Sequence, residues 1–173
     1  MIKKINKRTS AVLYQKAIQC VPLVESGLTS VLEKKTVWLP EVHELIQDLK
    51  DTAENIANQC LGLAANQIWD KDMQCPAVFI MRWPNDTDSR GWGWKAIINP
   101  QIKLTGKTLK LEEACLSFPG RHKKKSRGKN VTMLFQTETN IKMQVIKFLQ
   151  NHGNWGHIVQ HEYDHLLGTP VFK

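Results

Sequence analysis

Two histidines four residues apart, with a glutamate beside the first, stand near the end of the sequence. They are His161, Glu162 and His165, within the stretch VQHEYDHLLG. On an α-helix, side chains at positions i and i+4 lie one turn apart on the same face, so both imidazoles can reach one cation. Glu162 would project beside that cation, where its carboxylate can act as a base toward water. The spacing therefore predicts a metal-binding helix that carries its own general base.

A third histidine extends this stripe by one turn. His157 lies four residues before His161, but it would be about 12 Å from His165 along the helix axis, too far to share one ion. The competing pair, His157 with His161, has no glutamate between its members. We therefore expect His161 and His165 to bind the metal, and His157 to line the cavity as a hydrogen-bonded residue.

Cys115 is the candidate for the third ligand. It stands in EEACLSFPG, at the end of a predicted strand and just before a Pro-Gly turn, where a side chain can be presented into a cleft. A thiolate with two imidazoles suits zinc or ferrous iron and leaves a fourth position for water. The distance along the chain does not decide the matter, and a buried structural cysteine fits this residue equally well.

The composition is that of an ordinary globular protein. The chain has 173 residues, 42% hydrophobic and 23% charged, which predicts a single domain over residues 1–173 with a proper core. No apolar run is long enough to cross a membrane. The cysteines (Cys20, Cys60, Cys75 and Cys115) show no paired spacing, so we expect free thiols in a reducing compartment.

Basic residues are concentrated in two places. Residues 1–16 contain no acidic residue, which fits a basic N-terminal arm better than the alternative, an organelle transit segment. Residues 121–129, RHKKKSRGK, contribute much of the net charge of +8. The simplest interpretation of this run is a solvated loop between strands, and the alternative is attraction to a polyanion. The run has no aromatic residue for base stacking.

The elements that must position these residues follow from periodicity. An amphipathic helix is expected within 39–62, because apolar residues recur there at three-to-four spacing. Strands are expected at 75–83, 95–104 and 108–118, with a surface loop at 85–94 and a turn at 105–107. A hairpin is expected over 130–149, turning near residues 138–140. A final helix is expected from about Asn154 to Leu167, ended by Gly168 and Pro170. One α+β domain results.

Three stretches together resemble the peptide deformylase family. That family carries Gly-x-Gly-x-Ala-Ala-x-Gln, Glu-Gly-Cys-Leu-Ser and Gln-His-Glu-x-Asp-His in this order. The corresponding stretches here are CLGLAANQ at 60–67, EACLS at 113–117 and QHEYDH at 160–165. The resemblance covers roughly residues 17–170. It implies antiparallel sheets packed around a C-terminal metal-binding helix, with an amphipathic helix nearer the N-terminus.

The resemblance also implies roles for individual residues. One divalent metal would be held by Cys115, His161 and His165, natively ferrous iron, Fe(II), with zinc, nickel or cobalt able to substitute. Glu162 would be the general acid and base, and the Gln67 side chain and the Leu116 N–H would stabilise the oxyanion. The remaining implied residues are Leu61, Gly62 and His157 against the substrate, with the ion pair of Glu113 and Arg127 behind the metal ligands.

The implied reaction removes the formyl group from N-formylmethionyl peptides and releases formate. Expected partners are these peptides and, through residues 121–129, the ribosome. We expect a monomer in the cytoplasm of a bacterial or phage-infected cell, or alternatively in an organelle matrix or stroma. A metallopeptidase would not explain Gln67 and the cysteine motif. A catalytically silent relative that binds formyl-peptides or RNA would have no need of the intact ligand set and Glu162.

The chain departs from the family pattern at a few positions. Cys60 and Ala114 replace family glycines, each adding a small side chain near the expected substrate path. Asn154 and His157 stand where the family commonly has apolar residues that line the methionine pocket. The preference for methionine is therefore less secure than the reaction type.

Overall fold

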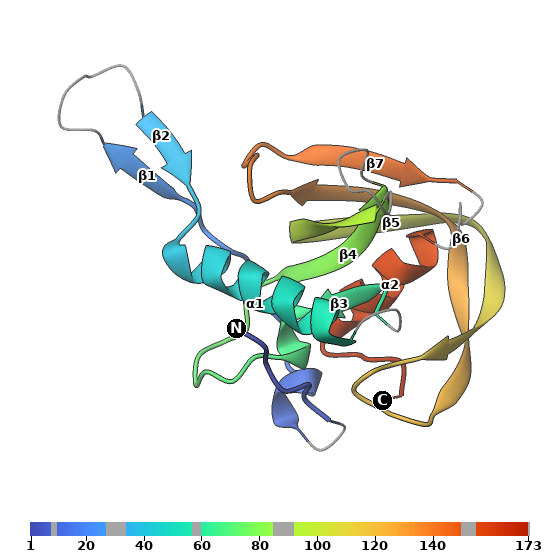
Figure 1. Cartoon of the computed structure of the whole chain (residues 1–173). Helices are drawn as coiled ribbons and strands as arrows, with labels where there is room; N and C mark the ends of the chain where they lie inside the picture. The colour runs from blue at the N-terminus through green and yellow to red at the C-terminus, as the bar shows by residue number, and fades with distance from the viewer. Residues whose placement is uncertain (8–9, 27–33, 57–59, 85–91, 150–154, 173) are drawn as a thin grey trace.

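One antiparallel sheet with a helix on each face forms the body of the protein (Figure 1). The structure is a computed structural model that describes residues 1–7, 10–26, 34–56, 60–84, 92–149 and 155–172. The sheet has the order β3-β4-β5-β6-β7, and its strands are β3 (Gly62–Ala64), β4 (Val78–Pro84), β5 (Trp92–Ala114), β6 (His122–Gln136) and β7 (Gln144–Phe148). The helices are α1 (Pro40–Ile56) and α2 (Trp155–Leu166). A separate pair, β1 (Leu23–Ser26) and β2 (Lys34–Val37), projects from the body, and two 3-10 turns are η1 (Ala11–Tyr14) and η3 (Ala65–Gln67).

Strand β4 shows how the sheet separates two layers of core. Its side chains alternate, because successive residues of a strand point to opposite faces. Val78 and Ile80 pack on the α1 side, whereas Phe79 and Met81 pack on the α2 side. All four are fully buried, so β4, the second strand of the sheet, packs against both helices.

Helix α1 covers one face of the sheet. It begins at Pro40, whose fixed φ suits a first helical turn, and Glu41 lies in that turn. Its buried apolar residues recur at three-to-four spacing and are Val42, Leu45, Ile46, Leu49 and Ala53. The helix lies within the interval 39–62, and residues 57–59 are outside the described part of the chain.

Helix α2 covers the other face and carries the His-Glu-x-x-His motif. The expected antiparallel sheet and C-terminal helix are confirmed. The helix ends where Gly168 adopts a φ of +68° and donates its N–H to the His165 carbonyl oxygen at 2.9 Å. Asn154 lies outside the described residues. Among those described, neither helix is long and apolar enough to cross a membrane.

The expected turn at 105–107 is wrong, because β5 runs on through it without reversing. The β5–β6 register shifts between Ile98 and Gln101 and again between Thr105 and Thr108. At the second shift Gly106 has a φ of +78°, a conformation that glycine adopts at little steric cost and that lets a strand absorb one extra residue as a bulge. The expected loop at 85–94 falls largely outside the described residues, and residues 92–94 belong to β5.

The expected solvated loop at 121–129 is also wrong, because residues 122–129 belong to β6. Two of its lysines lie opposite acidic residues of β5 in the register: Lys123 opposite Glu113, and Lys124 opposite Glu112. The pairing with β5, rather than the composition of the run, makes these residues a strand.

Candidate metal centre

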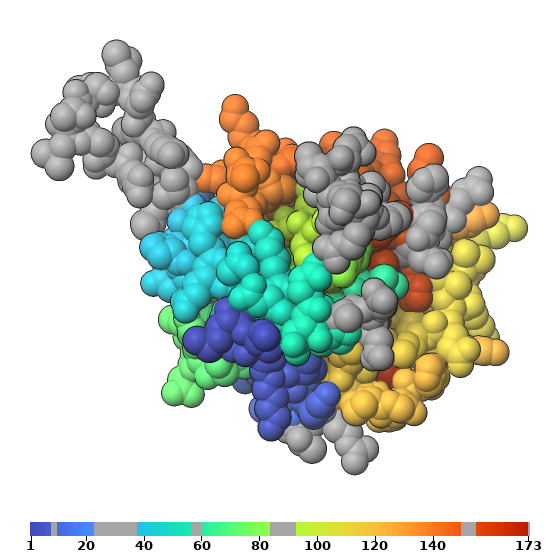
Figure 2. All heavy atoms as spheres, viewed as in Figure 1, coloured from blue at the N-terminus to red at the C-terminus, as the bar shows by residue number. Residues whose placement is uncertain are grey.

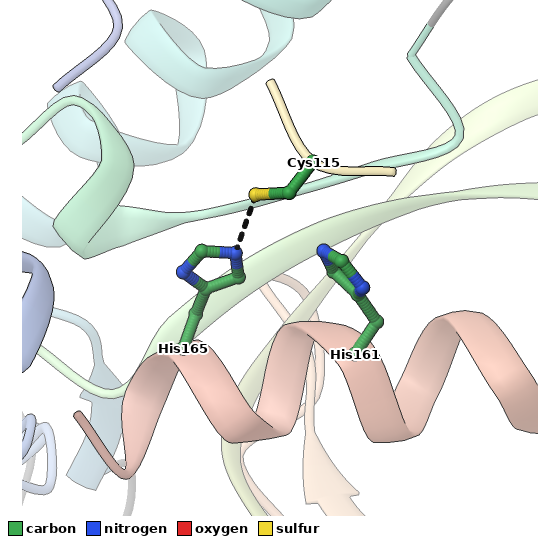
Figure 3. A group of neighbouring side chains, drawn as sticks. All are labelled: Cys115, His161 and His165. Atoms are coloured by element: carbon green, nitrogen blue, oxygen red, sulfur yellow. Dashed lines mark hydrogen bonds between the residues drawn. The ribbon is translucent and has the colours of Figure 1, made fainter. Parts of the chain in front are cut away.

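Three potential ligands converge between α2 and the turn that follows β5 (Figure 3). One ligand atom from each of Cys115, His161 and His165 lies within 4.8 Å of the other two. The Cys115 Sγ is 3.2 Å from His165 Nε2. The helix places the two histidines one turn apart, and the end of β5 delivers the cysteine over them. The structure thus brings together the ligand set expected from the sequence.

Glu113 orients the first of these histidines. Its carboxylate lies 2.8 Å from His161 Nδ1, which leaves the Nε2 of that ring available for a metal. Arg127 donates to the same carboxylate through Nε and Nη2, at 2.5 and 2.7 Å. Such a carboxylate–histidine arrangement fixes the tautomer and the direction of a ligand ring. The expected ion pair of Glu113 and Arg127 is therefore present, directly behind the ligands.

The electrostatics of the centre favour a cation among these groups. Burial alone would raise the pKa of Glu113, but hydrogen bonds from Arg127, His157 and His161 outweigh burial and hold that pKa well below its usual range. Burial likewise opposes protonation of His161, yet its interactions with Cys115 and Glu113 raise its pKa to about 10. Burial, together with the positive charge of His161, lowers the pKa of His165.

The donor set fits a divalent transition metal. A tetrahedral ion with bonds of about 2.3 Å to sulfur and 2.0–2.1 Å to nitrogen separates its ligand atoms by roughly 3 to 4 Å, close to the spacing of the three atoms. One sulfur and two imidazole nitrogens are ligands for zinc or ferrous iron rather than for magnesium or calcium. Three protein ligands also leave one position open, which is the pattern of a catalytic site.

Glu162 lies beside the ligands in a dry environment. Its side chain is buried, and its Oε2 atom has no hydrogen-bond partner among the described residues. Burial raises the pKa of this carboxyl group to about 7, with the positive charge of His161 opposing the rise. A carboxyl group with a pKa near neutrality can both accept and return a proton.

Gly62 allows Glu162 to occupy this position. We expected the glycine to make room for a substrate backbone, but the space that its Cβ would fill is taken by the glutamate. A Cβ at Gly62 would lie 2.7 Å from Glu162 Oε1 and 2.9 Å from its Cγ. Gly62 therefore sets the place of the buried carboxylate as well as one wall of the cleft.

Gly62→Ala is expected to lower the free energy of unfolding by about 1–3 kcal/mol, because the added methyl group overpacks the Glu162 side chain. Urea denaturation of metal-free protein in reducing buffer measures the change. The matched control adds the same methyl group in a Glu162→Ala background, where the crowded atoms are gone. An equal loss in both backgrounds would show that the methyl group clashes with something other than Glu162.

Gln67 and Leu116 both lie next to Cys115. The Gln67 side chain is buried; its Oε1 accepts from the Ala64 N–H at 2.8 Å, and its Nε2 lies 3.3 Å from Ser117 Oγ and 3.9 Å from Cys115 Sγ. Leu116 directly follows Cys115. Both expected oxyanion donors are thus adjacent to the ligands.

An open cleft of about 920 Å³ gives access to the centre. Three expected substrate contacts, Leu61, Gly62 and His157, line it together with Gln67, Cys115, Leu116, His161 and Glu162. His157 Nε2 lies 3.0 Å from Glu113 Oε1, and His157 is absent from the group of possible metal ligands. It occupies the place of a hydrogen-bonded cavity residue.

Some residues that hold the centre together were not singled out from the sequence. Asp164 accepts from Arg127 Nη1 at 2.6 Å and from Lys125 Nζ at 2.7 Å. Gln160 links α2 to β6. Its side-chain oxygen accepts from the Gly128 N–H at 2.8 Å, and its side-chain nitrogen donates to the Gly128 carbonyl oxygen at 3.0 Å. Helical spacing could have indicated Asp164, three residues after His161. Nothing in the sequence indicates which strand Gln160 meets.

Comparisons with known proteins agree with this geometry. A family model described as polypeptide deformylase matches residues 3–173. A peptide deformylase from Fusobacterium nucleatum is 34% identical over 139 residues, covering 78% of this chain and 71% of that protein. One from Rhodopirellula baltica is 33% identical over 113 residues, covering 65% of this chain and 51% of that protein, so the match spans about half of that relative's length. The crystal structure of a probable peptide deformylase from Synechococcus phage S-SSM7 has a TM-score of 0.72 at 24% identity, covering 98% of this chain and 97% of that one, which shows a shared fold.

Proposed function

The chain belongs to the polypeptide deformylase family, and from that premise we propose that it hydrolyses the formyl group from N-formylmethionyl peptides. The observation that carries the proposal is the group of Cys115, His161 and His165, whose ligand atoms lie within 4.8 Å of one another. Two of these residues, Cys115 and His161, line an open cleft. Beside this group lies Glu162, a buried carboxylate with one oxygen that has no hydrogen-bond partner in the described part of the chain. A ligand set, a base and access for a peptide are the parts that metal-assisted hydrolysis needs.

The proposed metal is one divalent cation held by Cys115, His161 and His165. When bound, it supplies Lewis-acid chemistry, which polarises a carbonyl oxygen and makes water acidic. Ferrous iron is the proposed native ion, with zinc, nickel and cobalt as substitutes, because a thiolate with two imidazoles accepts all of them. Glu113, held by Arg127, keeps the His161 ring in the orientation that binding requires.

The protein's own residues carry the remaining steps. Glu162 accepts a proton from water through Oε2, and the water oxygen forms a bond to the formyl carbon. The Gln67 side-chain amide and the Leu116 N–H stabilise the resulting oxyanion. Glu162 then gives its proton to the amine nitrogen as the carbon–nitrogen bond breaks. The products are formate and a peptide with a free amino terminus.

The cleft walls position the peptide. Gly62 begins β3 and Leu61 directly precedes it. An extended peptide can run beside this strand, and Leu61 is 54% exposed. His157 places a polar edge in the wall that would receive the first side chain. We propose that a methionine side chain enters there. The tolerance for other first residues is then set by His157 and its hydrogen bond to Glu113.

The direct test is release of formate from formyl-Met-Ala-Ser by protein purified without oxygen and loaded with ferrous iron. Formate should appear in proportion to bound metal, stop when a chelator removes the ion, and return on reloading with iron, nickel or cobalt. Metal-loaded protein that binds the peptide without releasing formate would instead support a catalytically silent relative. Cleavage of internal peptide bonds would support a metallopeptidase.

We further propose that the protein acts as a monomer in the cytoplasm of a bacterial or phage-infected cell and meets its substrates at the ribosome. The net charge of +8 supports the ribosomal part. Two cations of the basic run are occupied within the fold, since Lys125 and Arg127 bind Asp164, so exposed side chains such as Lys123 and Lys124 would carry the contact. Binding to ribosomes should weaken steeply as salt rises; salt-independent binding would contradict it.

A further inference from the structure

The N-terminal segment contacts the turn that carries Gln67. Asn6 donates its backbone N–H to the Gln67 carbonyl oxygen at 2.6 Å. Its side-chain Nδ2 donates to the carbonyl oxygens of Asn66 and Trp69, at 2.9 and 3.0 Å. These carbonyls lie in or just after η3, a turn too short to satisfy them internally. Asn6 therefore satisfies three acceptors of the segment that positions the Gln67 side chain.

The next residue contacts the other side of the centre. Lys7 Nζ donates to the Leu116 carbonyl oxygen at 3.2 Å. Ile5 and Lys7 both line the cleft. In the space-filling view the N-terminal segment (blue) lies against α1 and beside the segment that joins β5 to β6 (Figure 2). Ile5 and Lys7 thus form part of the cleft, and Asn6 and Lys7 contact the backbone of Gln67 and Leu116, the residues that carry the proposed oxyanion donors.

We propose that Asn6 is a positioning residue for deformylation, which holds the Gln67 side-chain amide in place, and that Lys7 gives weaker support on the Leu116 side. The inference rests on the proposed function. Hydrogen bonds from three other residues or to them hold Gln67: its Oε1 accepts from the Ala64 N–H, its Nε2 donates to Ser117, and its backbone carbonyl accepts from the Asn6 N–H. Of these three hydrogen-bond partners, Asn6 is the one that lies outside the family motifs. Lys7 is exposed, and a single solvated hydrogen bond contributes little.

The expected effect is on turnover rather than on binding. A small displacement of an oxyanion donor weakens the transition state more than the bound substrate. Asn6→Ala should therefore lower kcat by about tenfold and leave KM within about twofold. Asn6→Asp should be at least as harmful, because it keeps the size of the side chain but points an acceptor at two carbonyl oxygens. Lys4→Ala, at an exposed position of the same segment, is the matched control and should leave kcat unchanged.

A double-mutant cycle separates positioning from general stability. If Asn6 acts through Gln67, Asn6→Ala should change kcat by less than about twofold in a Gln67→Ala background. A further tenfold loss in that background would overturn the proposal, because the effect would then bypass Gln67.

Hydrogen–deuterium exchange tests the same idea independently of activity. Amides of residues 63–69 should exchange faster in Asn6→Ala than in the parent, while those of α1 and β4 keep the parent rate. Equal exchange at 63–69 would overturn the proposal. Faster exchange in a protein that never releases formate would support the positioning by Asn6 and reject the deformylase function, so the two failures are distinguishable.

Discussion

Replacing Glu162 by glutamine is expected to lower kcat for formate release by roughly 10²–10⁴-fold, the range that general acid–base catalysis contributes. The amide has the shape of the carboxylate and can occupy the same space beside Gly62, but it cannot accept a proton from water. Because the ligands stay intact, bound metal should remain near that of the parent protein. Steady-state formate release together with metal analysis measures both quantities.

The same variant tests whether the buried Glu162 carboxylate lowers the stability of the fold. Glu162 is buried with one oxygen unpartnered, and burial of a carboxylate without partners costs free energy. Glu162→Gln should therefore unfold at a temperature equal to or above that of the parent. Activity within about tenfold of the parent would show that another group moves the proton.

Replacing Arg127 by methionine is expected to lower the free energy of unfolding by about 3 kcal/mol, the lower end of the 3–5 kcal/mol lost when one partner of a buried ion pair is removed. Arg127 binds both Glu113 and Asp164, and the side chains of Arg127 and Glu113 are 4% and 1% exposed. Without the guanidinium, Glu113 keeps a buried charge. The lower figure is chosen because His157 and His161 still contact that carboxylate. Urea denaturation of metal-free protein measures the loss.

A matched control is Lys124→Met, a cation on the same strand that lies opposite Glu112 and is exposed. It should change the free energy of unfolding by less than about 0.5 kcal/mol.

The loss of stability caused by Arg127→Met should also depend on pH. The pKa of Glu113 is lowered from its ordinary 4.5, so its stabilising contribution is present above that value and disappears as the pH falls. The difference between parent and Arg127→Met should therefore narrow in acid, and a loss below about 1 kcal/mol at neutral pH would contradict the argument.

The helical part of the centre could be predicted from the sequence, because it depends on local periodicity. His161 and His165 are one turn apart wherever a helix forms, and Glu162 must lie next to them. The choice of His165 over His157 as ligand rested on distance along the helix together with the place of Glu162 between His161 and His165, and the structure groups His165 with Cys115 and His161. Cys115 itself remained ambiguous on spacing, because its approach to α2 depends on how β5 and β6 pair far from the helix.

The parts that could not be predicted depend on contacts between distant segments. The run 121–129 has the composition of a solvated loop, yet residues 122–129 form a strand because they pair with distant residues of β5. The turn expected at Gly106 is a bulge, since glycine with a positive φ permits either structure and only the partner strand decides. The contacts of Asn6 join residues about sixty positions apart, for which local pattern gives no signal.

The two register shifts in β5 constrain how many residues this strand can gain or lose. Because side chains alternate along a strand, each extra residue moves all later side chains of that strand to the opposite face of the sheet. Odd-numbered Ile97 and even-numbered Ile102 both pack on the α2 side, on either side of the first shift. After the second shift, at Gly106, odd-numbered side chains again point to the α2 side of the sheet. The side chain of odd-numbered Glu113 therefore contacts Arg127. The candidate metal centre therefore depends on whether the number of residues between Ile97 and Glu113 is odd or even. Losing one residue there would turn the Glu113 carboxylate away from His161, whereas losing two would turn it back.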